Sequence, residues 1–434
     1  MENRTTDSAS NEYKTGGRSA HWILFVGTML VMINQMDRAV VPAVLQSMKI
    51  DLGLSDMEAG ALITVMTLCI AIFSYPIGFL MDRWSRKKSI AIMAIVWSFF
   101  TFITGFAKNF WSALIPRALV GVGEAAYVPG SVALISAAYA KEKRGRVLSV
   151  GAIGSTFGLA LGMVVGGVIA ANMGWRYAMF IFAIPGIIFG LLALTFRDYK
   201  TIETRDETGR REGIFKATGK LFKIPTLPWF WVAYALALSL GTGVVSWLPA
   251  YMIRSLGIKE DIAGSLMAIM MVSGLIGIVA GAWLADLWQK KKSNGRVLFL
   301  SVCYPVSAAL CLILILGVTT GNIPFVIISG ILFSIAYNMG LPGVFAVGQD
   351  VVQPANKVLV SSMLQISSYV LAAAWAPMAI GALSDLLGGG VNGLKIALLV
   401  NCGIGIVPLV PFLLASKHYA ADVERVKDIV LEAE

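Results

Sequence analysis

Twelve long apolar runs constrain this chain more than any other feature of its sequence. Each run has about 20 residues, which as an α-helix crosses the roughly 30 Å hydrocarbon core of a bilayer. The runs do not alternate apolar and polar residues as β-barrel strands do. We therefore predict an all-α membrane protein with twelve transmembrane helices. The runs lie at about 21–46, 58–80, 89–107, 111–138, 147–170, 176–196, 228–253, 261–287, 296–317, 323–348, 358–385 and 393–415.

The charged residues fit this class in both number and position. Only 14% of the residues are charged, whereas soluble domains average about 25%. The net charge of +10 raises the alternative of nucleic-acid binding. However, about 27 of the 35 Lys and Arg residues fall in the two tails and the even-numbered loops if both termini are cytoplasmic. This positive-inside bias predicts a multi-pass protein of the plasma (inner) membrane with cytoplasmic termini and no nucleic-acid partner.

Two repeated motifs divide the chain into halves. The sequence Asp82-Arg83-Trp84 at the end of the second run recurs, 204 residues later, as Asp286-Leu287-Trp288 at the end of the eighth run. A basic cluster follows each copy. Pro129-Gly130 likewise recurs as Pro342-Gly343, 213 residues later. We expect two six-helix bundles at 21–196 and 228–415, together with a cytoplasmic N-terminal tail at 1–20, a cytoplasmic linker at 197–227 and a cytoplasmic C-terminal helix at 416–434.

Four ionisable residues lie near the middle of predicted helices. They are Asp37 and Arg38 in the first run, and Arg117 and Glu124 in the fourth. Seven residues separate Arg117 from Glu124, so both project from one helix face. At this depth a charge faces a protein interior or a wet cavity, and it is a functional candidate. The alternative is a pair of structural ion pairs, Asp37 with Arg117 and Arg38 with Glu124, or the reverse.

The chemistry of these four residues suits the exchange of a proton and an anion. Burial and a neighbouring arginine have opposite effects on the protonation of a carboxyl group, so Asp37 and Glu124 are candidate proton carriers. Arg38 and Arg117 stay charged and can bind a carboxylate or phosphate through two parallel hydrogen bonds. We expect a substrate site between the bundles, near the middle of the membrane.

The second half offers polar and aromatic residues rather than charges. Tyr337 stands at the repeat position of Glu124. Hydrogen bonding between helices, or packing, is the alternative role for each residue of this group. With Tyr127 of the first half, the further candidates for substrate binding are Trp247, Tyr337, Asn338 and Gln365.

The segment Gly78-x-x-x-Asp82-Arg83-x-Ser85-Arg86-Lys87 resembles the signature of the major facilitator superfamily, with Ser85 where glycine is usual. The resemblance covers nearly the whole chain. It implies that the two bundles rock about a central site and that the protein acts as a monomer. It also implies a conformational gate at the cytoplasmic helix ends. The gate would consist of Gly78, Asp82, Arg83 and Arg86, with Asp286 in the second half.

Two families within that superfamily share the local pattern of this chain. The segments Asn34-Gln35-Met36-Asp37-Arg38 and Arg117 to Tyr127 resemble both the anion:cation symporter family and the Spinster family. The resemblance implies a proton-coupled carrier of an organic anion, such as a carboxylate or sugar acid. The alternatives are a Spinster-like exporter of an amphiphilic phosphate or lysolipid, and a drug:proton antiporter. Met163 stands where those antiporters have a proline, which disfavours the last alternative.

Other classes of protein lack support in the sequence. The sequence shows neither a Ser/His pair nor a Gly-rich phosphate-binding loop with a lysine, which are patterns that would indicate an enzyme. The sequence contains only two histidines, His21 and His418, which argues against a histidine-based metal site. We therefore expect no enzymatic activity, no cofactor and no metal. The expected partners are a small anionic or amphiphilic molecule, protons and the lipid bilayer.

Overall fold

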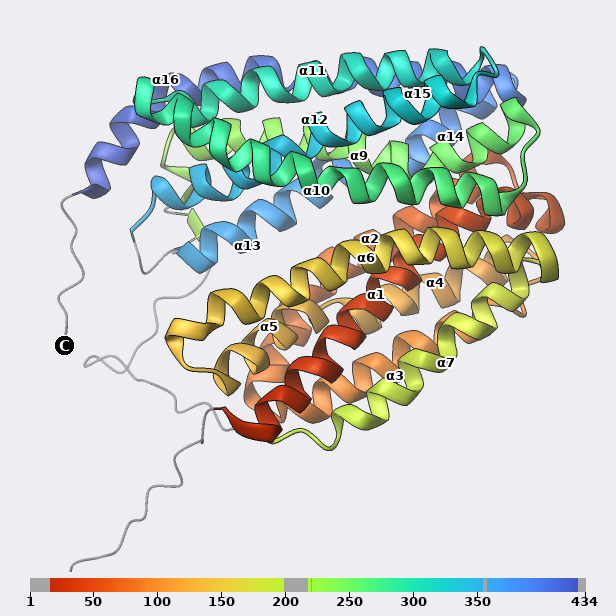
Figure 1. Cartoon of the computed structure of the whole chain (residues 1–434), viewed down its shortest axis with the longest axis horizontal. Helices are drawn as coiled ribbons and strands as arrows, with labels where there is room; N and C mark the ends of the chain where they lie inside the picture. Colours follow the sequence, from red (N-terminus) through yellow and green to blue (C-terminus); the bar gives the residue numbers. More distant parts are fainter. Residues whose placement is uncertain (1–15, 199–217, 220, 354–356, 428–434) are drawn as a thin grey trace, which may run out of the picture.

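The computed structural model describes residues 16–198, 218–219, 221–353 and 357–427, which are almost entirely helical (Figure 1). Within these ranges there is no β-strand, and twelve spans are long and apolar enough to cross a membrane. The predicted fold class is therefore confirmed. Most of the expected N-terminal tail (1–15), most of the expected linker (199–217 and 220) and the last residues of the expected C-terminal helix (428–434) lie outside the described residues.

The helices form two bundles, one from each half of the chain, which lie one above the other in Figure 1. The first bundle contains α1 (Gly17–Leu52), α2 (Asp56–Arg83), α3 (Arg86–Thr104), α4 (Phe110–Glu124), α5 (Tyr127–Ala138), α6 (Lys141–Met173) and α7 (Trp175–Ala193). The second contains α9 (Thr226–Leu256), α10 (Glu260–Lys291), α11 (Gly295–Val318), α12 (Ile323–Asp350), α13 (Lys357–Ser368), the π-helix η2 (Tyr369–Ala373), α14 (Ala376–Leu386), α15 (Gly390–Ile404) and α16 (Leu409–Lys427).

Prolines explain why three spans are divided into shorter helices. A proline has no N–H to donate to the carbonyl four residues before it. Pro129 lies four residues after Ala125, where α4 gives way to α5, and Pro408 lies four residues after Ile404, the end of α15. In the eleventh span, Pro377 leaves the carbonyl of Ala373 without its usual donor. The Thr242 hydroxyl of α9 donates to that carbonyl at 3.0 Å, so the break is held by a neighbouring helix.

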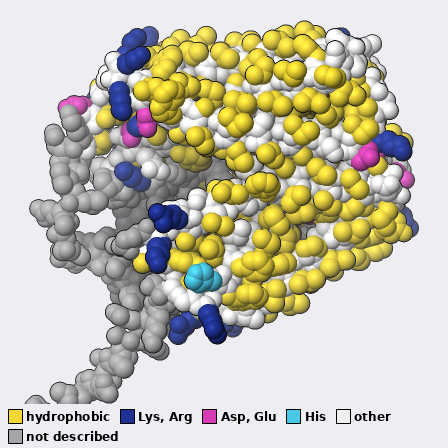
Figure 2. Space-filling model, viewed as in Figure 1, with side chains coloured by type: hydrophobic (Ala, Val, Ile, Leu, Met, Phe, Trp, Pro, Cys, Tyr) yellow, Lys and Arg dark blue, Asp and Glu magenta, His cyan; other side chains and the backbone are white. Residues whose placement is uncertain are grey.

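Apolar side chains cover the middle of both bundles, and charged side chains gather at the two ends (Figure 2). This distribution suits a protein surrounded by lipid, because charged groups at the ends remain in water. The twelfth span continues without a break from Leu409 to Lys427, so the segment beginning at 416 extends that span as one helix.

The two bundles meet closely at the end of the molecule opposite the start of α1 and the end of α16, which we call the closed end. There α2 packs on α14, and α6 packs on α10. Glycines make this contact possible: a Cβ at Gly264 would lie 2.2 Å from the carbonyl oxygen of Met163, and one at Gly381 would lie 2.1 Å from that of Asp56. At the other end, the tail end, α1 begins and α16 ends.

The close backbone contact at Gly264 predicts that Gly264→Ala opens the closed end. The added methyl group overlaps the Met163 carbonyl, which cannot move without shifting α6. We expect a longer distance between spin labels at Ile50 and Leu386, two exposed residues at this end, measured by pulsed electron paramagnetic resonance in a background without the native cysteines.

Gly151→Ala is the matched control, because Gly151 also lies in a span and its added Cβ meets nothing within 4 Å. That variant should keep the original label distance. An unchanged distance in Gly264→Ala would contradict the role assigned to this contact.

Candidate functional site

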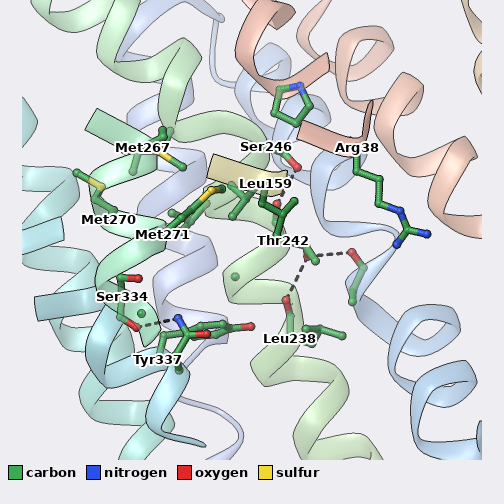
Figure 3. A pocket seen from close by; sticks show the side chains of 18 of the residues that line it. Arg38, Leu159, Leu238, Thr242, Ser246, Met267, Met270, Met271, Ser334 and Tyr337 are labelled. Atoms are coloured by element: carbon green, nitrogen blue, oxygen red, sulfur yellow. Dashed lines mark hydrogen bonds between the residues drawn. The ribbon is translucent and has the colours of Figure 1, made fainter. Parts of the chain in front are cut away.

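A central cavity of about 370 Å³ lies between the two bundles. Helices α1, α2 and α6 of the first bundle and α9, α10, α12 and η2 of the second contribute to its walls. Figure 3 shows Arg38 on one side of the cavity and the methionines of α10 on another. Its polar lining residues are Gln35, Arg38, Thr67, Thr156, Thr242, Ser246, Ser334, Tyr337, Asn338 and Tyr369. Among the residues that the structure describes, Arg38 is the one formally charged residue that lines it.

The four predicted charged residues come together in the first bundle as two ion pairs. Arg38 Nε donates to Glu124 Oε2 at 2.7 Å, and Arg117 Nη1 lies 3.5 Å from Asp37 Oδ2. The Thr101 hydroxyl donates to Asp37 Oδ1 at 2.7 Å. Of the two pairings that the sequence left open, this structure contains Asp37 with Arg117 and Arg38 with Glu124.

Only one member of this quartet reaches the cavity. The side chain of Arg38 is 24% exposed, whereas those of Glu124, Asp37 and Arg117 are 0%, 3% and 1% exposed. The face that carries Arg117 and Glu124 therefore points into the bundle and not into open water. An anion in the cavity can meet Arg38 directly, and it would compete there with Glu124.

Local sequence places Glu124 at this depth. Two glycines precede it on α4: a Cβ at Gly121 would lie 2.3 Å from the Met66 carbonyl oxygen of α2, and one at Gly123 would lie 2.8 Å from the Trp97 backbone nitrogen of α3. Helix α4 can therefore pack on both neighbours. It ends at Glu124, where the break before Pro129 turns the chain into α5.

Tyr337 and Asn338 line the central cavity from α12. Asn338 donates to the Ser334 carbonyl at 2.9 Å. Gly241 of α9 leaves room for the Tyr337 ring, because a Cβ there would lie 2.3 Å from its hydroxyl oxygen. Gln365 lines a second cavity of about 460 Å³, which shares Leu238 and Tyr369 with the central one.

Two of the residues predicted to bind substrate lie away from both of these cavities. Tyr127 is fully buried, packs edge-on against Trp97 with ring centroids 4.9 Å apart, and donates to the Gly27 carbonyl at 3.2 Å. Trp247 is fully buried, and its indole donates to the Pro377 carbonyl at 2.8 Å. In this conformation both residues join helices to one another and do not face the cavity.

The residues predicted to form a gate lie toward the tail end of the molecule. Gly78 belongs to α2, and Arg86 begins α3. The side chains of Asp82 and Arg83 lie outside the described part of the structure. Asp286 accepts from Arg296 at 2.8 Å, and Arg296 also pairs with Asp350 at 2.6 Å, so this network stays within the second bundle.

Sequence reasoning missed a polar cluster that joins the halves at the closed end. The side chain of Asp56 is fully buried and accepts from Arg254 Nη2 at 2.7 Å, from Arg254 Nη1 at 3.0 Å, from the Ser384 hydroxyl at 2.6 Å and from Lys49. Asp385 accepts from the backbone N–H groups of Asp56 and Met57, at 3.0 and 2.7 Å. We call Asp56, Arg254, Ser384 and Asp385 the closed-end latch.

No local signal distinguished the latch residues in the sequence. They stand at the ends of predicted spans, where charged side chains are ordinarily solvated. Their role appears only when α2 of the first bundle meets α9 and α14 of the second.

Arg254→Gln should weaken the closed end. The buried Asp56 carboxylate would lose two charge-assisted hydrogen bonds, each worth about 1.5–3 kcal/mol. We expect faster modification of a cysteine placed at Thr64, which is buried near the contact with α14, by a membrane-impermeant thiol reagent applied from the closed end. Arg176→Gln is the control, because Arg176 pairs with Asp51 inside the first bundle. Equal modification rates in the two variants would argue against the latch.

Comparison with known proteins identifies the family. The sequence model of the Major Facilitator Superfamily matches residues 27–377. Protein spinster homolog 1 of Xenopus tropicalis is 24% identical over 93% of this chain and 84% of its own length. The sphingosine-1-phosphate transporter of the same species is 28% identical, over 88% of this chain and 76% of its own length. The hexuronate transporter of Bacillus subtilis is 27% identical, over 62% of this chain and 65% of its own length.

Solved structures of transporters share this fold. One is the crystal structure of a bacterial homologue of the human lysosomal transporter Spinster in an inward-facing, unoccupied conformation. It matches with a TM-score of 0.77 and 20% identity over 96% of this chain and 100% of that chain. The predicted resemblance to the superfamily and to Spinster proteins is confirmed, and the relatives are transporters rather than enzymes. This chain is therefore a membrane transporter that belongs to the major facilitator superfamily.

Proposed function

We propose that this transporter moves an organic anion with a large apolar body, coupled to protons, by alternating access. The observation that supports this proposal best is the composition of the central cavity. Arg38 is the one charged side chain in the described part of its lining, and apolar residues make up most of the remaining wall. A single cation opposite an apolar wall suits a molecule with an anionic group at one end.

The apolar wall favours an amphiphilic substrate over a sugar acid. Met66 of α2 and Met267, Met270 and Met271 of α10 line the cavity, together with Phe333 of α12. Methionine side chains adapt to irregular apolar surfaces. A sugar acid needs a hydrogen-bonding partner for each of several hydroxyl groups, because polar groups buried without partners are costly. The relatives named above include a transporter for each class: the sphingosine-1-phosphate transporter for amphiphiles and the hexuronate transporter for sugar acids.

Exchange of partners at Arg38 provides the coupling in this proposal. An anion that binds Arg38 displaces the Glu124 carboxylate, which is fully buried and would then lie without its cation. An unpaired buried carboxylate is strongly disfavoured, so Glu124 takes up a proton. Anion and proton therefore occupy the same conformation together. In this scheme Asp37 and Arg117 stay paired throughout, so their two charges continue to neutralise each other.

The membrane orientation is also part of the proposal. The positive-inside bias assigns the tail end to the cytoplasm and the protein to the plasma (inner) membrane. The conformation described above is then open to the cytoplasm, with the closed-end latch sealing the opposite side. A monomer is sufficient, because both halves of the cavity come from one chain.

The amphiphile proposal predicts which substrate crosses the membrane. In proteoliposomes with an imposed proton gradient, a sphingoid-base phosphate should be transported faster than in the absence of the gradient, whereas a hexuronate should not. Arg38→Gln should abolish transport of the phosphate. Gradient-driven uptake of the hexuronate without transport of the amphiphile would overturn this assignment and support the sugar-acid alternative.

Glu124→Gln should separate exchange from proton-driven accumulation. The amide cannot take up a proton, so we expect loss of accumulation under a proton gradient while substrate counterflow continues. Glu58→Gln is the control, since Glu58 serves the helix cap of α2 and glutamine can preserve that cap. Loss of folded protein in Glu124→Gln, or accumulation at the original rate, would contradict the coupling role.

A further inference from the structure

Asn34 is a buried amide in the first bundle that has no hydrogen-bond partner among the residues that the structure describes. Its side chain is 0% exposed, and neither Oδ1 nor Nδ2 bonds to any other described residue. Most buried polar side-chain atoms in proteins are paired, and an unpaired one is costly. We therefore expect this amide to form hydrogen bonds in another state of the protein.

Helical spacing places Asn34 beside the connection between α4 and α5. Arg38 lies one turn after Asn34 on the same face of α1, and Gly27 lies two turns before it. Arg38 contacts Glu124, the last residue of α4, and Gly27 accepts from Tyr127, the first residue of α5. Asn34 therefore faces the segment where α4 ends at Glu124 and α5 begins at Tyr127.

Glu124 has one carboxyl oxygen available for such a partner. Its Oε2 accepts from Arg38, whereas Oε1 is buried without a partner among the described residues. The ionisable groups around it are Asp37 and Arg38 from α1, Arg117 from α4 and Tyr127 from α5, with Tyr369 of η2 across the cavity. From α2 and α3, the neighbours of this part of α4 are Met66, Cys69 and Trp97, and the Cys69 thiol is the titratable group among these three.

We propose that Asn34 is the hydrogen-bond partner of protonated Glu124. A protonated carboxyl group has one O–H donor and one carbonyl acceptor, and a primary amide offers the complementary acceptor and donors. Water at the tail end supplies the proton, the ion pair of Arg38 and Glu124 breaks, and Arg38 binds the substrate anion. Asn34 is thus a positioning residue for the proton carrier. This inference rests on the proposed proton coupling.

The test is the pH dependence of substrate transport by Asn34→Leu. Leucine has a similar volume and no polar atoms, so protonated Glu124 loses its partner and needs a higher proton concentration to form. We expect the pH of half-maximal transport to fall by about half to one unit, the shift produced by losing one hydrogen bond. Asn34→Ser, which keeps one hydroxyl, should give a smaller shift in the same direction.

Thr28→Val is the matched control. The Thr28 hydroxyl is also buried without a partner among the described residues, but Thr28 lies where α1 meets α6, with its methyl group 2.9 Å from the position of a Cβ at Gly154. This variant should keep the original pH of half-maximal transport, whatever its effect on thermal stability.

The outcomes distinguish this inference from the proposed function. If the unmodified protein is pH-dependent and both Asn34 variants keep its midpoint, or if Thr28→Val shifts it equally, the role of Asn34 is wrong while proton coupling stands. If Asn34→Leu does not fold, the midpoint of Asn34→Ser decides between these results. If the unmodified protein shows no pH dependence, the proposed coupling fails, and the role of Asn34 fails with it.

Discussion

The ion pair between Arg38 and Glu124 is the interaction on which the rest of this transporter depends. Moving both charges out of water carries a large desolvation cost, which their mutual attraction offsets only when geometry and neighbouring hydrogen bonds are favourable. Glu124 is fully enclosed, whereas Arg38 is partly exposed to the cavity. The arginine is therefore the residue through which the charged interior of the first bundle meets the central cavity.

The packing of the first bundle creates this arrangement. Glycines at 121 and 123 let α4 lie against the backbones of α2 and α3, and the break before Pro129 ends α4 at Glu124. A larger residue at either glycine would move the carboxylate away from Arg38. At the closed end, glycine contacts and the latch around Asp56 hold the two halves together. In the alternating access proposed above, the same contacts separate when the cavity opens to that side.

The sequence was sufficient to predict the twelve spans, the two bundles and the four charges within the spans. Each of these follows from local properties: the length of an apolar run, a repeat, or a charge within lipid. It could not choose between the two pairings of the charges, nor could it reveal the latch of Asp56 with Arg254. Those depend on how helices rotate about their axes and on how the halves meet. For the same reason the orientation of Tyr127 and Trp247, which face helix contacts rather than the cavity, was not apparent.

The most direct test of this account is an infrared difference spectrum of the protein with and without bound substrate. If the anion takes Arg38 from Glu124, substrate binding should produce the carbonyl band of a protonated carboxyl group, and this band should be absent in Glu124→Gln. A substrate-induced spectrum without that band, or with the same band in Glu124→Gln, would contradict the exchange of partners at Arg38.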